Sequence, residues 1–290
     1  IFDKHDPGSM SSYGNAGHFS PYAVVQLNRP DVIFDVPKML LSSYGPLALK
    51  WNYIPKMIPW IFKYLKSSTK KNMLHTAKYM HQILDLSLDA YDEILSEIDT
   101  TNLVERKGII YIWTNKNLKS RNLEIKIRND LGIKQKLLTK EEILDLEPNL
   151  SPVFDAGVIY DYAYHARDPK GITVKLFELF LKNGGKFKKE EVINVEQTRY
   201  NQTKVKTQSN DYNFEKIVLA SGAFSKKLTD QLGETIPLDT ERGYHIHYKN
   251  MDHLLQRPVI FLDRGFGMTP MNQGLRAVGT VELGGFNNPI

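Results

Sequence analysis

Ile1-Phe2-Asp3-Lys4 opens the chain and decides its fold, together with the turn Asp6-Pro7-Gly8 that follows. An apolar pair that ends in an acid and runs into a Pro-Gly turn is typical of the end of a β-strand. In a dinucleotide-binding βαβ unit, a Gly-rich turn lies about 20 residues before an acid that binds a ribose hydroxyl. Asp3 fits that acid, and the Gly-rich turn would then lie upstream of Ile1. We therefore expect a fragment of a nucleotide-cofactor enzyme, although Asp3 can also be a plain turn residue.

The next informative segment is the loop at 11–17, with the sequence Ser-Ser-Tyr-Gly-Asn-Ala-Gly. Two small hydroxyl residues and two glycines leave backbone N–H groups accessible. Such a loop can approach a phosphate or a flat ring closely. An ordinary surface loop is the alternative.

Composition excludes several classes of protein. The 290 residues, 41% hydrophobic and 24% charged, suffice for two globular domains. The chain has no Cys, which excludes disulfides, thiolate metal sites and Cys nucleophiles. We find no metal-ligand spacing and predict no metal. The net charge of +5 comes from lysines scattered through the chain, without an Arg-rich tract, so we do not expect nucleic-acid binding.

The segment 47–65 is apolar and aromatic but carries lysines and prolines, and it is too interrupted to span a membrane. One interpretation is an interfacial membrane patch formed by Trp51, Tyr53, Trp60, Phe62 and Tyr64. The other, which we favour, is a Pro-punctuated pair of short helices packed on the body.

Periodicity predicts the main helices and strands. A helix capped by Ser68 or Thr69 should cover 69–98 and bury Met73, Ala77, Met80, Leu84, Tyr91, Ile94 and Ile98. Strands are predicted at 108–113, 157–160 and 192–195, and a short helix at 140–150 that Pro148 ends. Another helix should begin with Asp168 and Pro169, bury Val174, Phe177 and Leu181, and end at Gly184-Gly185. Strand, helix and strand in this order predict a βαβ unit.

The segment 217–225 runs from an apolar stretch, Ile-Val-Leu, directly into small residues, Ala-Ser-Gly-Ala. This pattern is typical of a buried parallel strand whose C-terminal end opens onto a ligand. A tight structural turn is the alternative.

Taken in order, these motifs resemble the FAD-dependent amine and amino-acid oxidoreductases, and within them the bacterial D-amino acid dehydrogenases. The resemblance rests on Asp3, the Ser12–Gly17 loop with His18-Phe19-Ser20-Pro21, Val-Leu-Ala-x-Gly-Ala-x-Ser at 218–225, Glu-Arg-Gly-Tyr at 241–244, and Gly-Thr-x-Glu-x-x-Gly-Phe-Asn at 279–287. It covers nearly the whole chain.

The resemblance implies a role for each matching residue. FAD would be held by Asp3 at the ribose, Lys4 near the adenine, Ser12 at the pyrophosphate, Asn15, Ala16 and Gly17 along the ribityl chain, Val192 at the adenine, and Gly222 and Ala223 over the cofactor. His18 would lie toward the isoalloxazine, and Tyr244 and Glu282 would lie on the substrate side. The family also has a Gly-Leu-Arg-Pro segment whose Arg holds the substrate carboxylate, and Arg242, Arg257, Arg264 and Arg276 lie outside such a motif. We therefore expect the fragment itself to be inactive.

The implied fold is α/β, or α+β overall: an incomplete FAD-binding Rossmann-like domain at 1–28 and 152–232, and a substrate domain at 29–151 and 233–290. The second domain should hold helices and a mostly antiparallel sheet built from 108–113 and 236–283. The implied reaction is oxidative deamination of a D-amino acid by hydride transfer from Cα to FAD.

Two alternatives to that reaction remain: glycine- or sarcosine-type oxidation, and a non-catalytic basic module that binds a membrane or a partner. The resemblance leaves the electron acceptor, quinone or oxygen, open. It implies a cytoplasmic protein, with peripheral contact to the inner membrane as one option.

Overall fold

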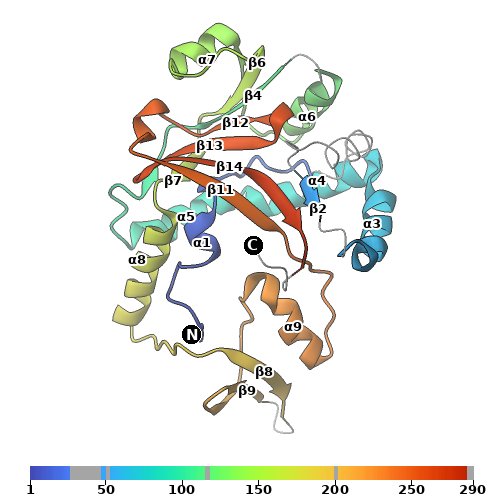
Figure 1. Cartoon of the computed structure of the whole chain (residues 1–290), viewed down its shortest axis with the longest axis vertical. Coiled ribbons are helices and arrows are strands. Elements are labelled where there is room, and N and C mark those ends of the chain that lie inside the picture. The colour runs from blue at the N-terminus through green and yellow to red at the C-terminus, as the bar shows by residue number, and fades with distance from the viewer. Residues whose placement is uncertain (27–46, 50–52, 115–117, 199–201, 286–290) are drawn as a thin grey trace.

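The computed structural model describes residues 1–26, 47–49, 53–114, 118–198 and 202–285. Its largest sheet has eight strands in the order β11-β14-β13-β12-β4-β6-β5, with β2 paired to β14 (Figure 1). The strands are β2 (Leu47–Leu49), β4 (Ile109–Trp113), β5 (Lys136–Thr139), β6 (Ala156–Tyr160), β11 (Arg242–Lys249), β12 (Val259–Phe261), β13 (Phe266–Met271) and β14 (Gly274–Leu283). Among the strand pairs of this sheet in the described residues, only β12–β4 and β14–β2 are parallel. The mostly antiparallel sheet is therefore confirmed.

Helices cover both faces of this sheet. On one face, Ile110 and Val259 pack with Ile143 of α7 (Lys140–Leu146). On the other, Ile109 and Tyr160 pack with Tyr22, and the same cluster takes in α4 (Lys70–Leu84) and α6 (Leu118–Asp130). Tyr22 stacks on Tyr160 at 3.6 Å between ring centroids. The chain that leaves the 11–17 loop thus becomes part of the sheet's core.

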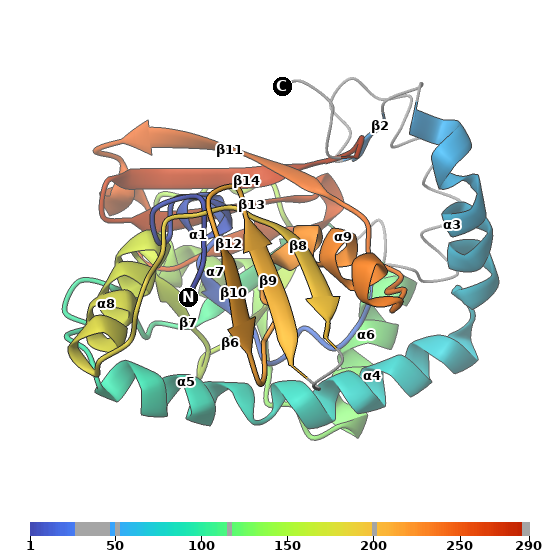
Figure 2. The same cartoon turned by 90° about the horizontal axis from the view of Figure 1, so that it is seen from below.

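Two small sheets complete the strands of the described ranges. One has the order β1-β7-β3, from β1 (His18–Phe19), β7 (Tyr164–Ala166) and β3 (Val104–Glu105). The other is β10-β9-β8, from β8 (Val192–Gln197), β9 (Thr203–Thr207) and β10 (Asp211–Phe214), and Figure 2 shows it beside α9 (Ser225–Thr229).

The predicted βαβ unit is wrong. Helix α8 (Pro169–Lys182) does follow β6 and precede β8, but these strands belong to different sheets. After α8, the chain makes a parallel contact at Lys188, which pairs with Phe2 and not with β6. Order along the chain could not reveal this because pairing is decided by contacts distant in sequence. Strand β6 also joins the large sheet, although it falls in the range 152–232 predicted for the cofactor domain; the domain boundaries stay a prediction.

The buried strand predicted at 217–225 is also wrong. Residues 217–221 have no regular structure, and Val218 is 90% exposed. An apolar stretch becomes a buried strand only when other strands pair with it and cover it. In the described residues, no strand pairs with this segment.

The helix signals were accurate at the ends and less so along the faces. Asp168 caps α8 by accepting from the Gly171 N–H at 2.9 Å, and Thr69 caps α4. The predicted helix at 69–98 is two helices, α4 and α5 (Ser87–Ser96). The stripe predicted to be buried is only partly so. Three of its residues, Met80, Tyr91 and Ile94, are 37–48% exposed. Leu181 of α8 is likewise exposed.

The segment 47–65 does not form two packed helices. It contributes β2 and a single helix, α3 (Ile54–Ser67), with Pro59 inside it, and Trp51 lies outside the described residues. Within α3, Met57 is the buried side chain. Among the helices of the described ranges, none is long and apolar enough to cross a bilayer.

Candidate functional site

Asp3 stands at the end of a short parallel pairing. The Lys188 N–H donates to the Ile1 carbonyl at 2.9 Å, and the Asp3 N–H donates to the Lys188 carbonyl at 3.2 Å. The exposed Asp3 carboxylate accepts one bond, from the His5 N–H through Oδ1 at 2.8 Å. An acceptor-only group at the C-terminal end of a parallel strand fits the position of a ribose ligand.

Lys4 joins the three segments expected around the adenosine. Its Nζ lies 2.8 Å from Glu191 Oε1 and 5.7 Å from the ring centroid of Phe224. Glu191 precedes Val192, and Phe224 follows Gly222 and Ala223 in one turn of 3₁₀ helix. Residues separated by about 190 and 220 positions in sequence therefore meet at one surface. Gly222 has φ +55°, and a side chain there would meet no atom within 4 Å, so its backbone is open to a close approach.

The 11–17 loop is held in shape by its own polar groups. Its first residues form the single turn α1 (Ser11–Gly14), and Asn15 Oδ1 accepts from the Gly17 N–H at 2.7 Å. Gly17 has φ +72°, and a Cβ there would lie 2.6 Å from the Ala166 carbonyl oxygen. Only glycine fits, because this φ and this contact both exclude a side chain. Ala16 is placed between these two fixed residues, and Ser12 is the second residue of α1.

Arg276 clamps this loop from the large sheet. Its Nη1 donates to the Tyr13 and Asn15 carbonyls, both at 2.8 Å, and its side chain is 6% exposed. Burial lowers the pKa of Arg276 from its usual value. Sequence analysis placed Arg276 outside the Gly-Leu-Arg-Pro motif and gave it no role. The signal it missed is a guanidinium between apolar neighbours in a strand, since an Arg on a buried face needs carbonyl or carboxylate acceptors.

His18 lies in a second polar group on the same face of the sheet. Its Nε2 is 2.8 Å from Thr269 Oγ1 on β13, and it pairs with His165 across β1 and β7. Burial, and then the neighbouring His165, lower the pKa of His18 to about 4. Burial likewise lowers the pKa of His165 to about 4. Both rings are therefore neutral at pH 7.

Tyr244 and Glu282 form a third group. The Tyr244 hydroxyl donates to Glu282 Oε2 at 3.2 Å, and Arg242 Nη1 lies 3.3 Å from Glu282 Oε1. Side chains alternate along β11, with Tyr244 outward and exposed and His245 turned toward Gly14 in the 11–17 loop. The structure thus brings Tyr244 and Glu282 together, on the other side of the strand from the loop that holds Asn15.

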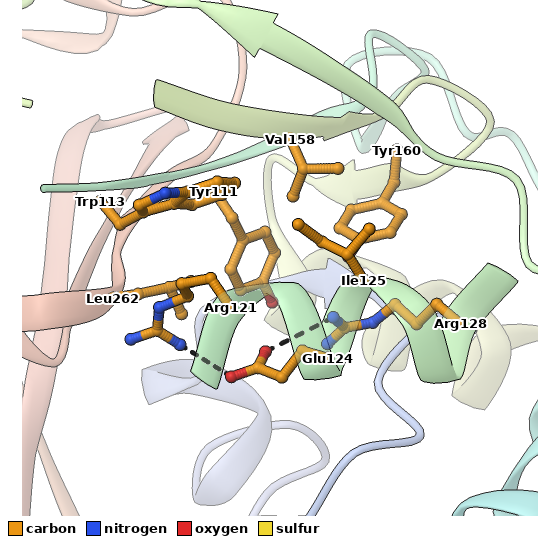
Figure 3. A pocket seen from close by; sticks show the side chains of 9 residues that line it. All are labelled: Tyr111, Trp113, Arg121, Glu124, Ile125, Arg128, Val158, Tyr160 and Leu262. Carbon is orange, nitrogen blue, oxygen red and sulfur yellow. Dashed lines mark hydrogen bonds and ion pairs between the residues drawn. The ribbon is translucent and has the colours of Figure 1, made fainter. Parts of the chain in front are cut away.

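A pocket between α6 and the sheet was not predicted (Figure 3). It is lined by Tyr111, Trp113, Tyr160 and an ionic series on α6, in which Glu124 contacts Arg121 at 2.8 Å and Arg128 at 3.4 Å. The space amounts to about 240 Å³ including its open mouth, too little for a dinucleotide. The i, i+3 and i+4 spacing of these charges was the available signal. We interpret the series as a structural network that fixes α6.

The described residues fit FAD. The exposed Asp3 carboxylate suits a ribose, the open space at Gly222 allows a ligand near its backbone, and Lys4 joins the separate segments.

Comparison with known proteins agrees. A family model described as FAD dependent oxidoreductase matches residues 1–290. The chain is similar to a D-amino-acid oxidase of Bradyrhizobium diazoefficiens, 31% identical over 288 residues that cover 98% of this chain and 68% of that protein. It is also similar to a D-amino acid dehydrogenase of Helicobacter pylori, 26% identical over 98% of this chain and 68% of that protein.

Solved structures support the fold. The crystal structure of glycine oxidase from Geobacillus kaustophilus superposes with a TM-score of 0.64 at 17% identity. It covers 99% of this chain, which spans 64% of the glycine oxidase chain. The L-alpha-glycerophosphate oxidase of Mycoplasma pneumoniae, with FAD bound, has the same TM-score at 16% identity. The chain belongs to the FAD-dependent oxidoreductase family, and FAD is its cofactor.

Proposed function

We propose that the protein oxidises a D-amino acid at Cα. The α-carbon gives up a hydride and the amino nitrogen a proton, which leaves an imino acid that water hydrolyses to a 2-oxo acid and ammonium. FAD supplies the hydride acceptor when it is bound. The observation that carries this proposal is the 31% identity to a D-amino-acid oxidase along 98% of the chain.

The cofactor residues have separate proposed roles. Asp3 accepts hydrogen bonds from the adenosine ribose, and Lys4 and Val192 lie along the adenosine. Gly222 and Ala223 cover the cofactor from the opposite segment. Ser12 faces the pyrophosphate, and Asn15, Ala16 and Gly17 follow the ribityl chain. The hydrogen bond from Gly17 to Asn15 and the clamp from Arg276 support this assignment, since both fix the loop before a ligand arrives.

The residues proposed for the reacting centre are His18, toward the isoalloxazine, and Tyr244 and Glu282, on the substrate side. His18, whose pKa is about 4, offers a neutral ring that accepts or donates a hydrogen bond without adding charge. Tyr244 is oriented by its bond to Glu282, which Arg242 also contacts. We propose that Tyr244 positions the substrate through its hydroxyl.

The test of cofactor binding is flavin titration of purified full-length protein carrying Asp3→Asn. This change keeps the acceptor for the His5 N–H but removes the charge. Loss of a hydrogen bond to a charged group costs about 1.5–3 kcal/mol, so FAD affinity should fall roughly 10- to 150-fold. Asp6→Asn, which removes an exposed carboxylate paired with Lys189, is the matched control. Equal affinities in the two variants would remove Asp3 from the ribose.

The test of the reaction is anaerobic mixing of the holoprotein with D-alanine, L-alanine, glycine or sarcosine. We expect D-alanine to bleach the flavin. Tyr244→Phe should slow this step roughly tenfold, the effect of one lost hydrogen bond. Tyr248→Phe, on the same strand and exposed on the same side, should leave it unchanged. If only glycine or sarcosine bleaches the flavin, the reaction is the alternative one, glycine- or sarcosine-type oxidation.

The same preparation distinguishes the electron acceptors. An oxidase consumes oxygen during turnover with a D-amino acid, whereas a dehydrogenase needs an added quinone analogue. Because the family is one of oxidoreductases, we do not retain the non-catalytic basic module as a candidate for the whole protein.

A further inference from the structure

The excess positive charge of this protein, attributed above to scattered lysines, is in fact concentrated in one segment. Although lysines occur throughout the chain, residues 36–84 contain eight of the 38 basic residues and none of the 33 acidic ones. This segment therefore carries +8, and the other 241 residues together carry −3. Its lysines are Lys38, Lys50, Lys56, Lys63, Lys66, Lys70, Lys71 and Lys78. A stretch of this length with lysines and no acids creates a region of positive potential, which the proposed flavin chemistry does not use.

Helix α3 lies within this segment and exposes an apolar stripe. Ile58, Phe62 and Leu65 recur at i, i+4 and i+7 and keep 47%, 70% and 44% of their surface exposed. At about 100° per residue they lie within about 60° of one another around the helix. The body of the protein is contacted by a different side, where Met57 is buried. Figure 2 shows α3 at the outer edge of the molecule.

Lysines lie beside the apolar stripe, on the side of it opposite to Met57. Lys56, Lys63 and Lys66 are exposed, and the same 100° spacing places them together on the side of the helix away from Met57. Lys70 and Lys71 begin the next helix and are also exposed. An apolar stripe flanked by lysines, with no acid, is the composition of a helix that lies in a membrane interface.

We propose that α3 binds the surface of an anionic lipid bilayer. The stripe Ile58–Phe62–Leu65 enters the boundary of the acyl chains, and the lysines of α3 and of the start of α4 contact the headgroups. Charge selects this occupant. A second copy of the chain would bring the same lysines against one another, and an uncharged partner would leave them unused.

Vesicle co-sedimentation of the full-length holoprotein tests the proposal. Vesicles of phosphatidylcholine with 30% phosphatidylglycerol should bind the protein, and phosphatidylcholine alone should bind it far less. Each basic residue at an anionic surface raises partitioning about fivefold, so the double variant Lys63→Glu with Lys66→Glu should bind at least 25-fold more weakly. Lys134→Glu with Lys182→Glu changes the net charge equally outside the segment and should bind as the wild type does.

The apolar part is tested by Phe62→Ser, expected to weaken binding about tenfold or more. Ile83→Ser is the matched control, since Ile83 is also 70% exposed but lies at the far end of α4. Because both side chains are exposed, the melting temperature and flavin content should be unchanged in either variant. Binding that ignores lipid charge, or that Phe62→Ser and Ile83→Ser reduce alike, would overturn the proposal. So would a dimer in sedimentation analysis that only Phe62→Ser dissociates, because the stripe would then bind a second copy.

Discussion

The substitution Gly17→Ala tests how the 11–17 loop is built. Gly17 has φ +72°, and an added Cβ would lie 2.6 Å from the Ala166 carbonyl oxygen and 3.2 Å from Met271 Cε. The Met271 side chain can move, but Ala166 belongs to β7, where it pairs with Val104 of β3, so its carbonyl cannot move alone. Relief therefore requires a shift of the loop backbone.

The expected cost has two parts. A left-handed backbone costs an alanine roughly 1–2 kcal/mol relative to glycine. Moving Gly17 away from Ala166 also weakens the bonds from the Ala166 N–H to the Gly17 carbonyl and from the Gly17 N–H to Asn15 Oδ1, both 2.7 Å long. Each contributes about 1 kcal/mol. We expect a loss of about 2–4 kcal/mol in unfolding free energy.

The matched control is Gly233→Ala. Gly233 has φ +81°, but an added Cβ would meet no atom within 4 Å. This variant should lose only the backbone part, roughly 1–2 kcal/mol. Urea unfolding followed by tryptophan fluorescence measures both losses, and flavin titration should show weaker FAD binding for Gly17→Ala alone. Equal losses in the two variants, with equal FAD affinity, would refute the assignment of Gly17 as a residue that positions the cofactor loop.

Two further predictions concern the buried polar groups. Arg276→Met should raise hydrogen exchange at residues 11–17 and lower the free energy of unfolding by roughly 2 kcal/mol. Two hydrogen bonds to a charged group are lost, while the burial of an unneutralised cation is relieved. Arg264→Met, which removes an exposed cation, should change neither quantity. Acidification should destabilise the fold. His18 and His165 have folded-state pKa values of about 4, below the usual 6.5, so the unfolded chain binds more protons than the folded one as the pH falls. The stability that the neutral histidines contribute is complete above pH 6.5 and is lost toward pH 4. At pH 5 each histidine should cost roughly 2 kcal/mol, and the urea midpoint of His165→Leu should depend less on pH between 7 and 5 than that of the wild type.

Sequence signals predicted best what is decided locally. The Asp168 cap and the Pro169 start of α8 depend on residues within one turn, and both are present. Strands β4 and β6 of the large sheet were also recognisable, because they are apolar and mostly buried. Signals that need a partner were weaker. Val218 has the composition of a buried strand, yet it is exposed where no described strand pairs with it.

The candidate site shows the same division. Asn15 and Gly17 could be selected from sequence because their shape is set by each other. Arg276 could not, because its acceptors lie more than 260 residues away in the chain. The contact of Lys4 with Glu191, across 187 residues, was equally invisible. The resemblance succeeded because it used the order of many short motifs, and each motif is locally determined.

The Gly-Thr-x-Glu motif at 279–282 has a physical reason that appears only in the pairing of β11 with β14. Gly243 pairs with Val281 and His245 with Val278, so Gly279 and Thr280 together oppose the single residue Tyr244. Without this bulge, strict alternation would place Glu282 on the same face as Arg276, six residues before it. The extra residue reverses the face and brings Glu282 within 3.2 Å of the Tyr244 hydroxyl.

Gly279 is the residue that permits the bulge. A Cβ at this position would lie 2.8 Å from Phe266 Cβ and 3.0 Å from the Gly265 carbonyl oxygen on the neighbouring strand side. A larger residue would push β14 away from β13, and the register that brings the Tyr244 hydroxyl beside Glu282 would have to change. The glycine and the glutamate of this motif therefore act together, since the first allows the change of face that the second requires.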